Sequence, residues 1–192
     1  MQTPTRLMTY EEYLELPYLG RRTEFVDGRV IELNPPGPLH NEIAETLFIW
    51  LRSYFITNGL PYRCKDDLQI EIPPVINRGR GREPDLVVCT KDQWAEIMSS
   101  GQPSFRLGNP PLIAIEILSP SNWRQDMKEK QAEYARAGVP EYWRINPWEK
   151  WVEVLQLNKN STYKVKRFKG DTNIESGELP QLGLAAKQIL EV

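Results

Sequence analysis

Histidine, cysteine and long apolar runs are scarce in this sequence of 192 residues. The single histidine, His40, excludes a metal site made of several histidines, and the two cysteines, Cys64 and Cys89, show neither zinc-site spacing nor a disulfide framework. No apolar run is long enough to span a membrane, and the N-terminus has no apolar signal-peptide core. We therefore expect a cytoplasmic protein without a membrane partner.

Strong net charge is also absent. The net charge of −2 and the isoelectric point of about 5.6 exclude a general binder of polyanions, although residues 77–83 and 163–170 form two local basic stretches. Such stretches are commonly solvated surface, and these two matter only if they flank a site that handles phosphates. The length, with 40% hydrophobic and 26% charged residues, predicts one domain over residues 1–192.

Hydrophobic periodicity predicts an α/β fold with a mixed central sheet flanked by helices. Thr9 and Glu12 form a capping box for a short helix, and Asp27-Gly28 predicts the turn of a hairpin over 23–33. The core, about 41–147, is expected to run helix, three strands, helix, strand, before a second hairpin over 150–169. The predicted core elements are a helix from Asn41 to Asn58-Gly59, strands at 68–72, 85–89 and 112–118, a short helix capped by Thr90 and Gln93, a helix from Ser121 to Ala137, and a strand at 141–146.

One carboxylate interrupts the most apolar strand. Glu116 lies within residues 112–118, where the near-continuous apolar run predicts burial on both faces. An unpaired buried charge is costly, so Glu116 needs a partner. Asp85 begins the preceding strand; if the two strands pair, the two carboxylates converge at one edge of the sheet, where Mg²⁺ would suit them. The alternatives are an Asp85 that only caps a turn and a Glu116 that pairs with an arginine.

The helix after this strand supplies further polar groups. Asp126, Lys130 and Tyr134 recur every four residues and therefore share one face. The helix follows the Glu116 strand directly, so the long side chain of Lys130 could reach a metal-bound water or a phosphate. A surface salt bridge between Asp126 and Lys130 is the simpler alternative, and such a pair contributes only about 0.3–0.5 kcal/mol.

At these residues the sequence resembles the PD-(D/E)XK nuclease superfamily and, within it, the restriction-endonuclease-like Uma-two family. The specific part is the glutamate strand followed by the lysine helix, because PD alone is a weak motif. The matching segments span about residues 10–155 and are EPDLVVC (83–89), IAIEILSPSN (113–122), DMKEKQAEYARAGVPEYW (126–143) and, more loosely, TEFVDGRVIEL (23–33) and PLHNEIAETL (38–47).

The resemblance implies a magnesium site with three oxygen ligands. The two carboxylates are those of Asp85 and Glu116, and the third ligand is the carbonyl of Ile117. The sequence departs from the superfamily's short form at Leu118, which stands where a lysine is expected two positions after the glutamate.

In this family a lysine on the following helix replaces the missing one. Lys130 is the match, with Lys128 as the alternate. His40 falls where the family often has a histidine before the first long helix, and its other interpretation is packing at the helix start. Asp126 and Tyr134 are secondary candidates for the site because they share the helix face of Lys130.

The predicted function is that of a metal-dependent endonuclease, which hydrolyses phosphodiester bonds of DNA with Mg²⁺ as cofactor and Mn²⁺ as a substitute. We expect a homodimer by analogy, because a duplex presents two strands. We also expect weak, salt-sensitive binding through a few phosphate contacts. The candidates for these contacts are Arg78, Arg80, Arg82 and Arg124.

Two other functions remain open. A catalytically degenerate nuclease fold could act as a nucleic-acid- or protein-binding module, and Leu118 in place of lysine favours this alternative. A glycosidase could also use paired carboxylates, but lysine and arginine beside the carboxylates disfavour a sugar site. Loss of metal-dependent cleavage on replacing Asp85 or Glu116 would distinguish an enzyme from a binding module.

Overall fold

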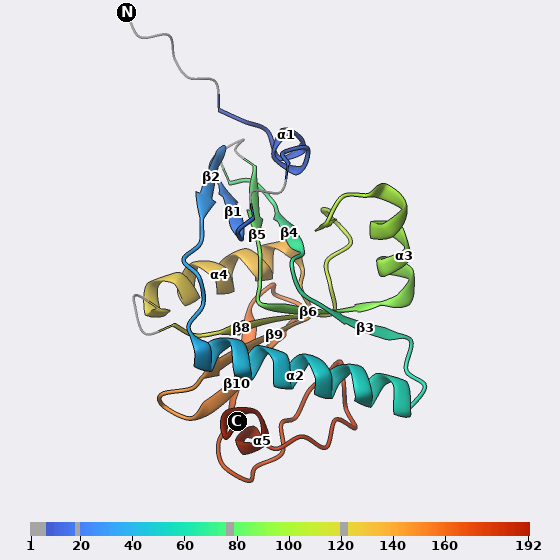
Figure 1. The fold of residues 1–192 in the computed structure, drawn as a ribbon, viewed down its shortest axis with the longest axis vertical. Helices are drawn as coiled ribbons and strands as arrows, with labels where there is room; N and C mark the ends of the chain where they lie inside the picture. Colours follow the sequence, from blue (N-terminus) through green and yellow to red (C-terminus); the bar gives the residue numbers. More distant parts are fainter. Residues whose placement is uncertain (1–6, 18–19, 76–78, 120–122) are drawn as a thin grey trace, which may run out of the picture.

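The structure, a computed structural model, describes residues 7–17, 20–75, 79–119 and 123–192, without the side chains of 123–125. Within these ranges the chain forms an α/β fold with two mixed sheets and intervening helices (Figure 1). The helices are α1 (Tyr10–Leu14), α2 (Pro38–Thr57), α3 (Lys91–Ser100), α4 (Trp123–Ala137) and α5 (Ala186–Leu190).

The strands divide between a five-stranded sheet, in the order β2-β1-β5-β4-β7, and a six-stranded sheet, in the order β11-β10-β9-β8-β6-β3. The first sheet is formed by β1 (Thr23–Val26), β2 (Arg29–Glu32), β4 (Gln69–Ile72), β5 (Arg80–Arg82) and β7 (Ser104–Phe105). The second is formed by β3 (Tyr62–Lys65), β6 (Leu86–Thr90), β8 (Ile113–Ile117), β9 (Glu141–Asn146), β10 (Trp151–Leu157) and β11 (Tyr163–Phe168).

Strand β8 lies in the interior of the six-stranded sheet, and all five of its residues are buried. It runs parallel to β9 and antiparallel to β6, with Leu86 opposite Ile115. The expected pairing of the two carboxylate-bearing segments is therefore confirmed. Extending this register by one residue brings Asp85 opposite Glu116, because antiparallel partners change in opposite directions along the two chains.

The two faces of β8 contact different layers. Ile113, Ile115 and Ile117 belong to the core beneath α2 and α5, whereas Ala114 and Leu118 belong to the core on the side of α4. This alternation is the one expected for a strand, and it directs Glu116 toward α4. Helix α4 also contacts β4, so it lies between the two sheets (Figure 1).

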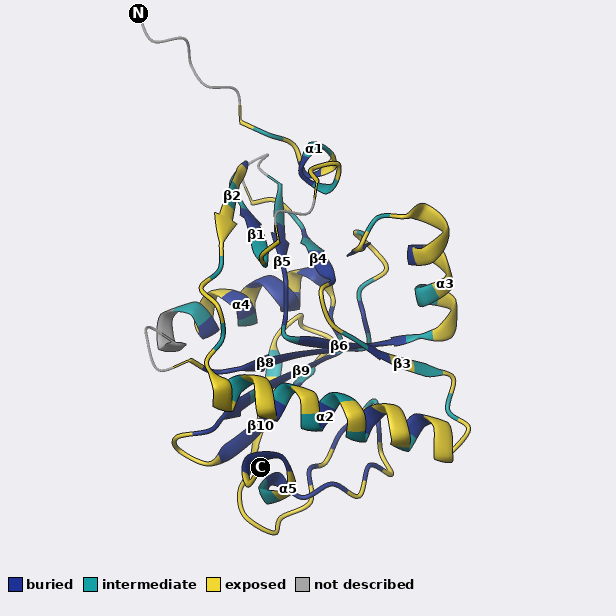
Figure 2. Cartoon of the chain, in the orientation of Figure 1, coloured by how far each residue is buried: buried dark blue, intermediate teal, exposed yellow. Residues whose placement is uncertain are grey.

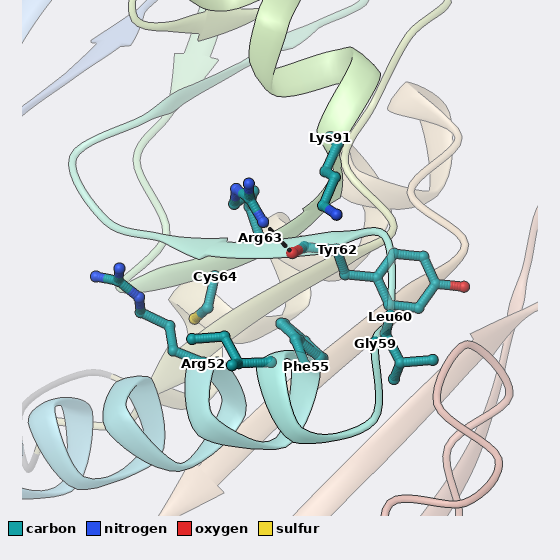
Figure 3. Close-up of a pocket in the computed structure, with 9 residues that line it drawn as sticks. Arg52, Phe55, Gly59, Leu60, Tyr62, Arg63, Cys64 and Lys91 are labelled. Carbon is teal, nitrogen blue, oxygen red and sulfur yellow. Dashed lines mark hydrogen bonds between the residues drawn. The ribbon is translucent and has the colours of Figure 1, made fainter.

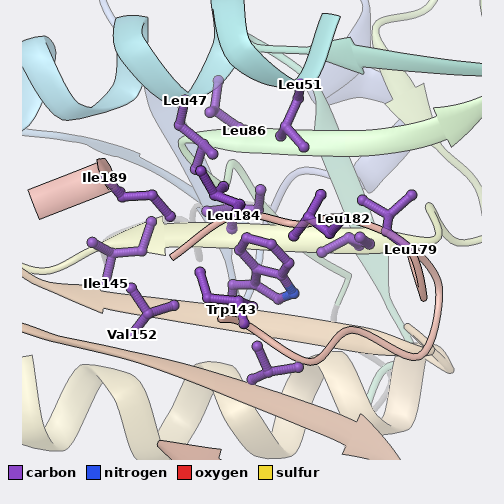
Figure 4. Close-up of a cluster of buried hydrophobic side chains, with 14 of the residues drawn as sticks. Leu47, Leu51, Leu86, Trp143, Ile145, Val152, Leu179, Leu182, Leu184 and Ile189 are labelled. Atoms are coloured by element: carbon purple, nitrogen blue, oxygen red, sulfur yellow. The ribbon is translucent and has the colours of Figure 1, made fainter. Parts of the chain in front are cut away.

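A fully buried tryptophan, Trp143 of β9, lies in the core on the α2 side of the sheet. Figure 4 shows Leu47 and Leu51 reaching toward it from α2, with Leu184 and Ile189 arriving from the C-terminal segment. The indole nitrogen of Trp143 donates to Glu141, 2.6 Å away.

The buried carboxylate of Glu141 ties the C-terminal segment to this core. It accepts hydrogen bonds from the Ser176 hydroxyl at 2.5 Å and from the Gly177 backbone at 2.6 Å, in addition to the indole of Trp143. These donors satisfy a carboxylate that is 0% exposed. Glu141 therefore fixes the segment that leads to α5.

The predicted turns and helix ends are largely confirmed. The capping boxes at Thr9 and Thr90 form, and Asp27 and Gly28 adopt the positive φ values of 53° and 81° that a tight hairpin turn requires. Helix α2 begins at Pro38, three residues before the predicted start, because proline suits the first turn of a helix. Figure 2 shows its buried stripe toward the sheet and its exposed outer face.

The predicted mixed central sheet corresponds to the six-stranded sheet, but the strand at 68–72, which was assigned to it, is β4 and belongs to the five-stranded sheet. In the six-stranded sheet β3 takes the place beside β6. β5 and β7 were missed because they have only three and two residues, and the sequence of β5, Arg-Gly-Arg, carries no apolar periodicity. The predicted helix start at Ser121 lies outside the described residues. No helix within the described ranges is both long enough and apolar enough to cross a membrane.

The burial pattern of α2 predicts unequal effects of two alanine substitutions on the same helix. Leu47 is 1% exposed and Ile49 is 55% exposed. We expect Leu47→Ala to lower the free energy of unfolding by about 2–5 kcal/mol, because it leaves a cavity against the sheet. Ile49→Ala should change it by less than about 0.5 kcal/mol. Urea denaturation measures both, and equal losses would contradict this packing.

Candidate active site

Glu116 is held by two side chains of α4. The Lys130 amine lies 2.9 Å from Oε1 and donates to Oε2 at 3.0 Å, and the Tyr134 hydroxyl donates to Oε1 at 2.7 Å. All three residues are buried. The spacing of Lys130 and Tyr134, one helical turn apart, places both donors on the face that covers β8.

Asp85 precedes β6 and contacts the end of β8. The backbone N–H of Ile117 donates to its Oδ2 at 2.7 Å, His40 Nε2 lies 3.1 Å from the same oxygen, and Arg22 donates to Oδ1 at 2.7 Å. The proline before Asp85 cannot donate a hydrogen bond to a neighbouring strand. Strand β6 therefore starts at Leu86, and Asp85 lies at the end of that strand.

The environments of the two carboxylates push their pKa values apart. Burial raises the pKa of Glu116 to about 7; the Lys130 charge opposes this shift, and the Asp85 charge adds to it. Burial acts in the same direction on Asp85, but the hydrogen bond and charge of His40, with Arg22 and the Ile117 N–H, hold its pKa at about 2. Asp85 thus lies close enough to Glu116 for its charge to raise the pKa of Glu116.

Lys130 lies among three carboxylates from different parts of the fold. In addition to Glu116, its amine lies 3.3 Å from Glu24 of β1 and 3.7 Å from Asp126 of the same helix. Despite its burial, these acids raise the pKa of the lysine, which therefore stays cationic. Lys128 is exposed, so the structure places Lys130 rather than Lys128 beside Glu116.

Sequence reasoning missed Arg22 and Glu24, which contact Asp85 and Lys130 respectively. Glu24 is 3% exposed and also pairs with Arg82 at 2.5 Å. The available signal was the two-residue spacing of Arg22 and Glu24, which puts both charges on one face of the hairpin strand opposite Phe25. That pattern indicates a charged face of the strand, but it does not show which residues elsewhere in the chain these charges contact.

A cavity of about 470 Å³ opens beside Asp85 and His40. Its lining includes the acids Glu45, Asp66 and Asp67, with Arg22 as the cation next to Asp85. His40 stands in the first turn of α2, and its Nδ1 is buried without a hydrogen-bond partner among the described residues. The Asp85 side of the site therefore faces an acidic cavity.

Of the four arginines predicted to contact phosphates, two form ion pairs with carboxylates of the fold, and the side chains of the other two lie outside the described part. Arg82 is 5% exposed and contacts Glu24 and Glu133, while Arg80 pairs with Asp27 and Glu133. These ion pairs connect the five-stranded sheet to α4. Arg78 and the side chain of Arg124 lie outside the described residues.

Within the described ranges, no group of three or more acidic, histidine or cysteine side chains is arranged around a common metal position. Mg²⁺ commonly takes only one or two carboxylates and completes its shell with water and substrate phosphate. The hard carboxylate oxygens of Asp85 and Glu116 fit that chemistry, and the Ile117 main chain lies beside Asp85. Both carboxylates contact cationic side chains here, so a bound ion would share them with Arg22 and Lys130.

The family model described as "Putative restriction endonuclease" (Uma2) matches residues 10–187, so this chain belongs to the Uma2 family. Among solved structures, the chain is similar to "a putative nuclease belonging to DUF820" from Anabaena variabilis ATCC 29413. The TM-score is 0.74 at 20% identity, with 96% of this chain and 98% of that chain covered, so the two share a fold. A comparison with curated proteins gave no match. The expected restriction-endonuclease-like fold is confirmed, and family membership supports a nuclease.

Removing the cation at Glu116 should make stability more strongly pH-dependent. The pKa of this carboxyl rises from 4.5 to about 7 on folding, so the folded state binds more protons in that window and stability falls as pH rises through it. Without Lys130 the pKa rises further. We expect Lys130→Met to lose about 3–5 kcal/mol of unfolding free energy at pH 8, and less at pH 5, in urea denaturation.

Lys128→Met is the matched control, since it removes the same charge two residues earlier from an exposed position. Its unfolding free energy should stay within about 0.5 kcal/mol of the parent value at both pH values. If the Lys130→Met loss were the same at pH 5 and pH 8, the pairing with Glu116 would not be the cause.

Proposed function

We propose that this protein is a magnesium-dependent endonuclease that hydrolyses phosphodiester bonds of DNA. The observation that carries the proposal is Glu116, a fully buried carboxylate in a central strand. Its partners are a lysine and a tyrosine of the following helix, and burial, together with the charge of Asp85, raises its pKa. Perturbed carboxylates with a cationic neighbour are typical of functional sites, and membership of a nuclease family gives this one its chemistry.

Metal dependence is supported by the charge of the cavity beside Asp85. A phosphodiester is anionic, and the cavity is lined by four carboxylates, Glu45, Asp66, Asp67 and Asp85. The arginine and the histidine that also line the cavity carry too little positive charge to neutralise four carboxylates and an incoming phosphate. A divalent cation would remove this repulsion, which is the reason for including Mg²⁺ in the proposal.

The proposed roles follow from the contacts. Asp85 and Glu116, with the carbonyl of Ile117, would hold the ion, which supplies Lewis-acid activation of the phosphate and of water. Lys130 would orient the attacking water or stabilise charge that develops on the phosphoryl oxygens. Arg22, which lines the cavity, would contact the phosphate once the ion shares Asp85.

The polar groups around Asp85, Glu116 and Lys130 are proposed to hold these three side chains in position. Tyr134 would fix the carboxylate of Glu116, while Glu24 and Asp126 would keep the ammonium in place. His40 would orient Asp85 through its Nε2 contact.

A homodimer acting on the two strands of a duplex stays a prediction, which sedimentation velocity of the protein with duplex DNA would test.

Replacing either carboxylate by its amide should abolish cleavage. We expect Asp85→Asn and Glu116→Gln each to lower the rate of Mg²⁺-dependent cleavage of plasmid DNA by about 10²–10³-fold or more, because each loses a proposed ion ligand. Gel electrophoresis of supercoiled plasmid measures nicking and linearisation. Glu42→Gln, on the exposed side of the first turns of α2, makes the same charge change and should cleave as the parent does.

Cleavage that persists in both amide variants would contradict the assignment of the two carboxylates. If the unaltered protein cleaves neither DNA nor RNA with Mg²⁺ or Mn²⁺, the endonuclease proposal is wrong. The chain would then act as a nucleic-acid- or protein-binding module with a nuclease fold.

Metal binding can be tested without catalysis. At an Mn²⁺ concentration of about a hundred times its dissociation constant, binding to the folded state adds about 2.7 kcal/mol and should raise the Tm by about 5–10 °C. The rise should vanish in Asp85→Asn and remain in Glu42→Gln, as followed by differential scanning fluorimetry. An equal rise in all three proteins would place the ion elsewhere.

A further inference from the structure

A second concave surface lies at the opposite end of α2 from His40. This pocket, of about 440 Å³, is lined by residues of α2, of β3 and of the loop between them, and by the first residue of α3. Its three charged lining residues are Arg52, Arg63 and Lys91, and no acid lines it (Figure 3). In a protein with a net charge of −2, this surface has the opposite sign to the cavity beside Asp85.

The three cations of this pocket, unlike those near Glu116, have no acidic partner in the described part of the chain. Arg63 donates only to the Tyr62 carbonyl, at 3.2 Å, and the Arg52 guanidinium lies over the Phe48 ring at 5.2 Å. All three side chains are exposed. By contrast, Arg22 and Lys130 each contact carboxylates. The pocket cations therefore keep their full charge available to an anionic ligand.

The floor between the cations is apolar and partly aromatic. Phe55 is buried and meets the half-buried Tyr62 edge to face, with ring centroids 5.7 Å apart. Ile56, on the rim, is 75% exposed. Cations around such a floor suit a nucleic-acid backbone, whose phosphates meet the charges and whose sugars contact the exposed apolar rim.

The pocket lies within reach of one nucleic acid bound at the candidate active site. His40 and Arg52 are twelve residues apart on the same helix, and Ile56 lies four residues further. At 1.5 Å per residue, these positions are about 18 and 24 Å from His40 along the axis. A duplex rises by 3.4 Å per base pair, so this distance corresponds to about five to seven base pairs.

We propose that the pocket formed by Arg52, Arg63 and Lys91 binds the phosphate backbone of the nucleic-acid substrate away from the cleavage site. This inference rests on the proposed nuclease function and extends it. It assigns the anchoring of the strand to cations that the sequence did not single out, while Arg80 and Arg82 stabilise the fold through their ion pairs. Backbone contacts of this kind position a substrate without reading its sequence.

The test compares two triple variants in the complete chain. Arg52→Gln/Arg63→Gln/Lys91→Gln removes the pocket charges. Lys159→Gln/Lys164→Gln/Lys169→Gln is the control, because it removes three exposed charges from the region of the C-terminal hairpin, none paired with an acid in the described part. Fluorescence anisotropy with a labelled duplex of about 30 base pairs, in EDTA so that cleavage cannot occur, gives Kd over a range of salt concentrations.

We expect the pocket variant to bind at least about tenfold more weakly, with a salt slope smaller by about 2.7, since each lost phosphate contact contributes about 0.9. The control should stay within about twofold of the parent protein in Kd, with an unchanged slope. Parent-like binding by the pocket variant, or an equal loss in the control, would overturn the inference. So would poly-L-glutamate that displaces the duplex at equal charge concentration, because the pocket would then accept any polyanion.

The outcome is separable from that of the nuclease proposal. Because binding is measured without divalent ions, a protein that never cleaves DNA can still show the loss of affinity, and the pocket assignment then stands alone. Conversely, cleavage that depends on Asp85 and Glu116, together with unaltered binding by the pocket variant, refutes the pocket and leaves the nuclease proposal intact.

Discussion

The contact between Glu116 and Lys130 is the interaction on which the arrangement of the site depends. Strand β8 buries a carboxylate, and among the described residues only α4, which crosses between the two sheets, brings a cation to it. Glu24 of the five-stranded sheet approaches the same ammonium from another element. Strand, helix and second sheet therefore meet at the Lys130 charge, and loss of that charge would leave the buried carboxylate of Glu116 without a compensating cation.

The sequence predicted the parts of the site that follow from local pattern. Strict alternation along 112–118 directs Glu116 away from the isoleucine face, and the four-residue spacing of Lys130 and Tyr134 places both donors on one helix face. Arg22 and Glu24 were beyond this reasoning. They belong to a hairpin that lies some 60 to 110 residues from their partners in the sequence. The pairing of β1 with β5 depends on tertiary contacts, and the sequence Arg-Gly-Arg gives no local pattern that predicts it.

Charge runs proved a poor guide to which cations are available. The arginines of the 77–83 stretch that are described, Arg80 and Arg82, contact carboxylates of β1, its turn and α4. The three pocket cations, which have no acidic partner among the described residues, are dispersed over 40 positions of the sequence and become neighbours only through folding. In the 77–83 stretch, a cluster of arginines in the sequence therefore corresponds to internal ion pairs rather than to accessible charge.

The anchoring of the C-terminal segment by Glu141 has a consequence for biosynthesis. Leu184 and Ile189 pack beside Trp143 and complete the layer beneath α2, a helix that leaves the ribosome more than a hundred residues earlier. Until residues 184–190 emerge, the part of that apolar face which they cover remains open to water and to other nascent chains. Synthesis of residues 184–190, rather than formation of the central strands, would be the step that completes this core.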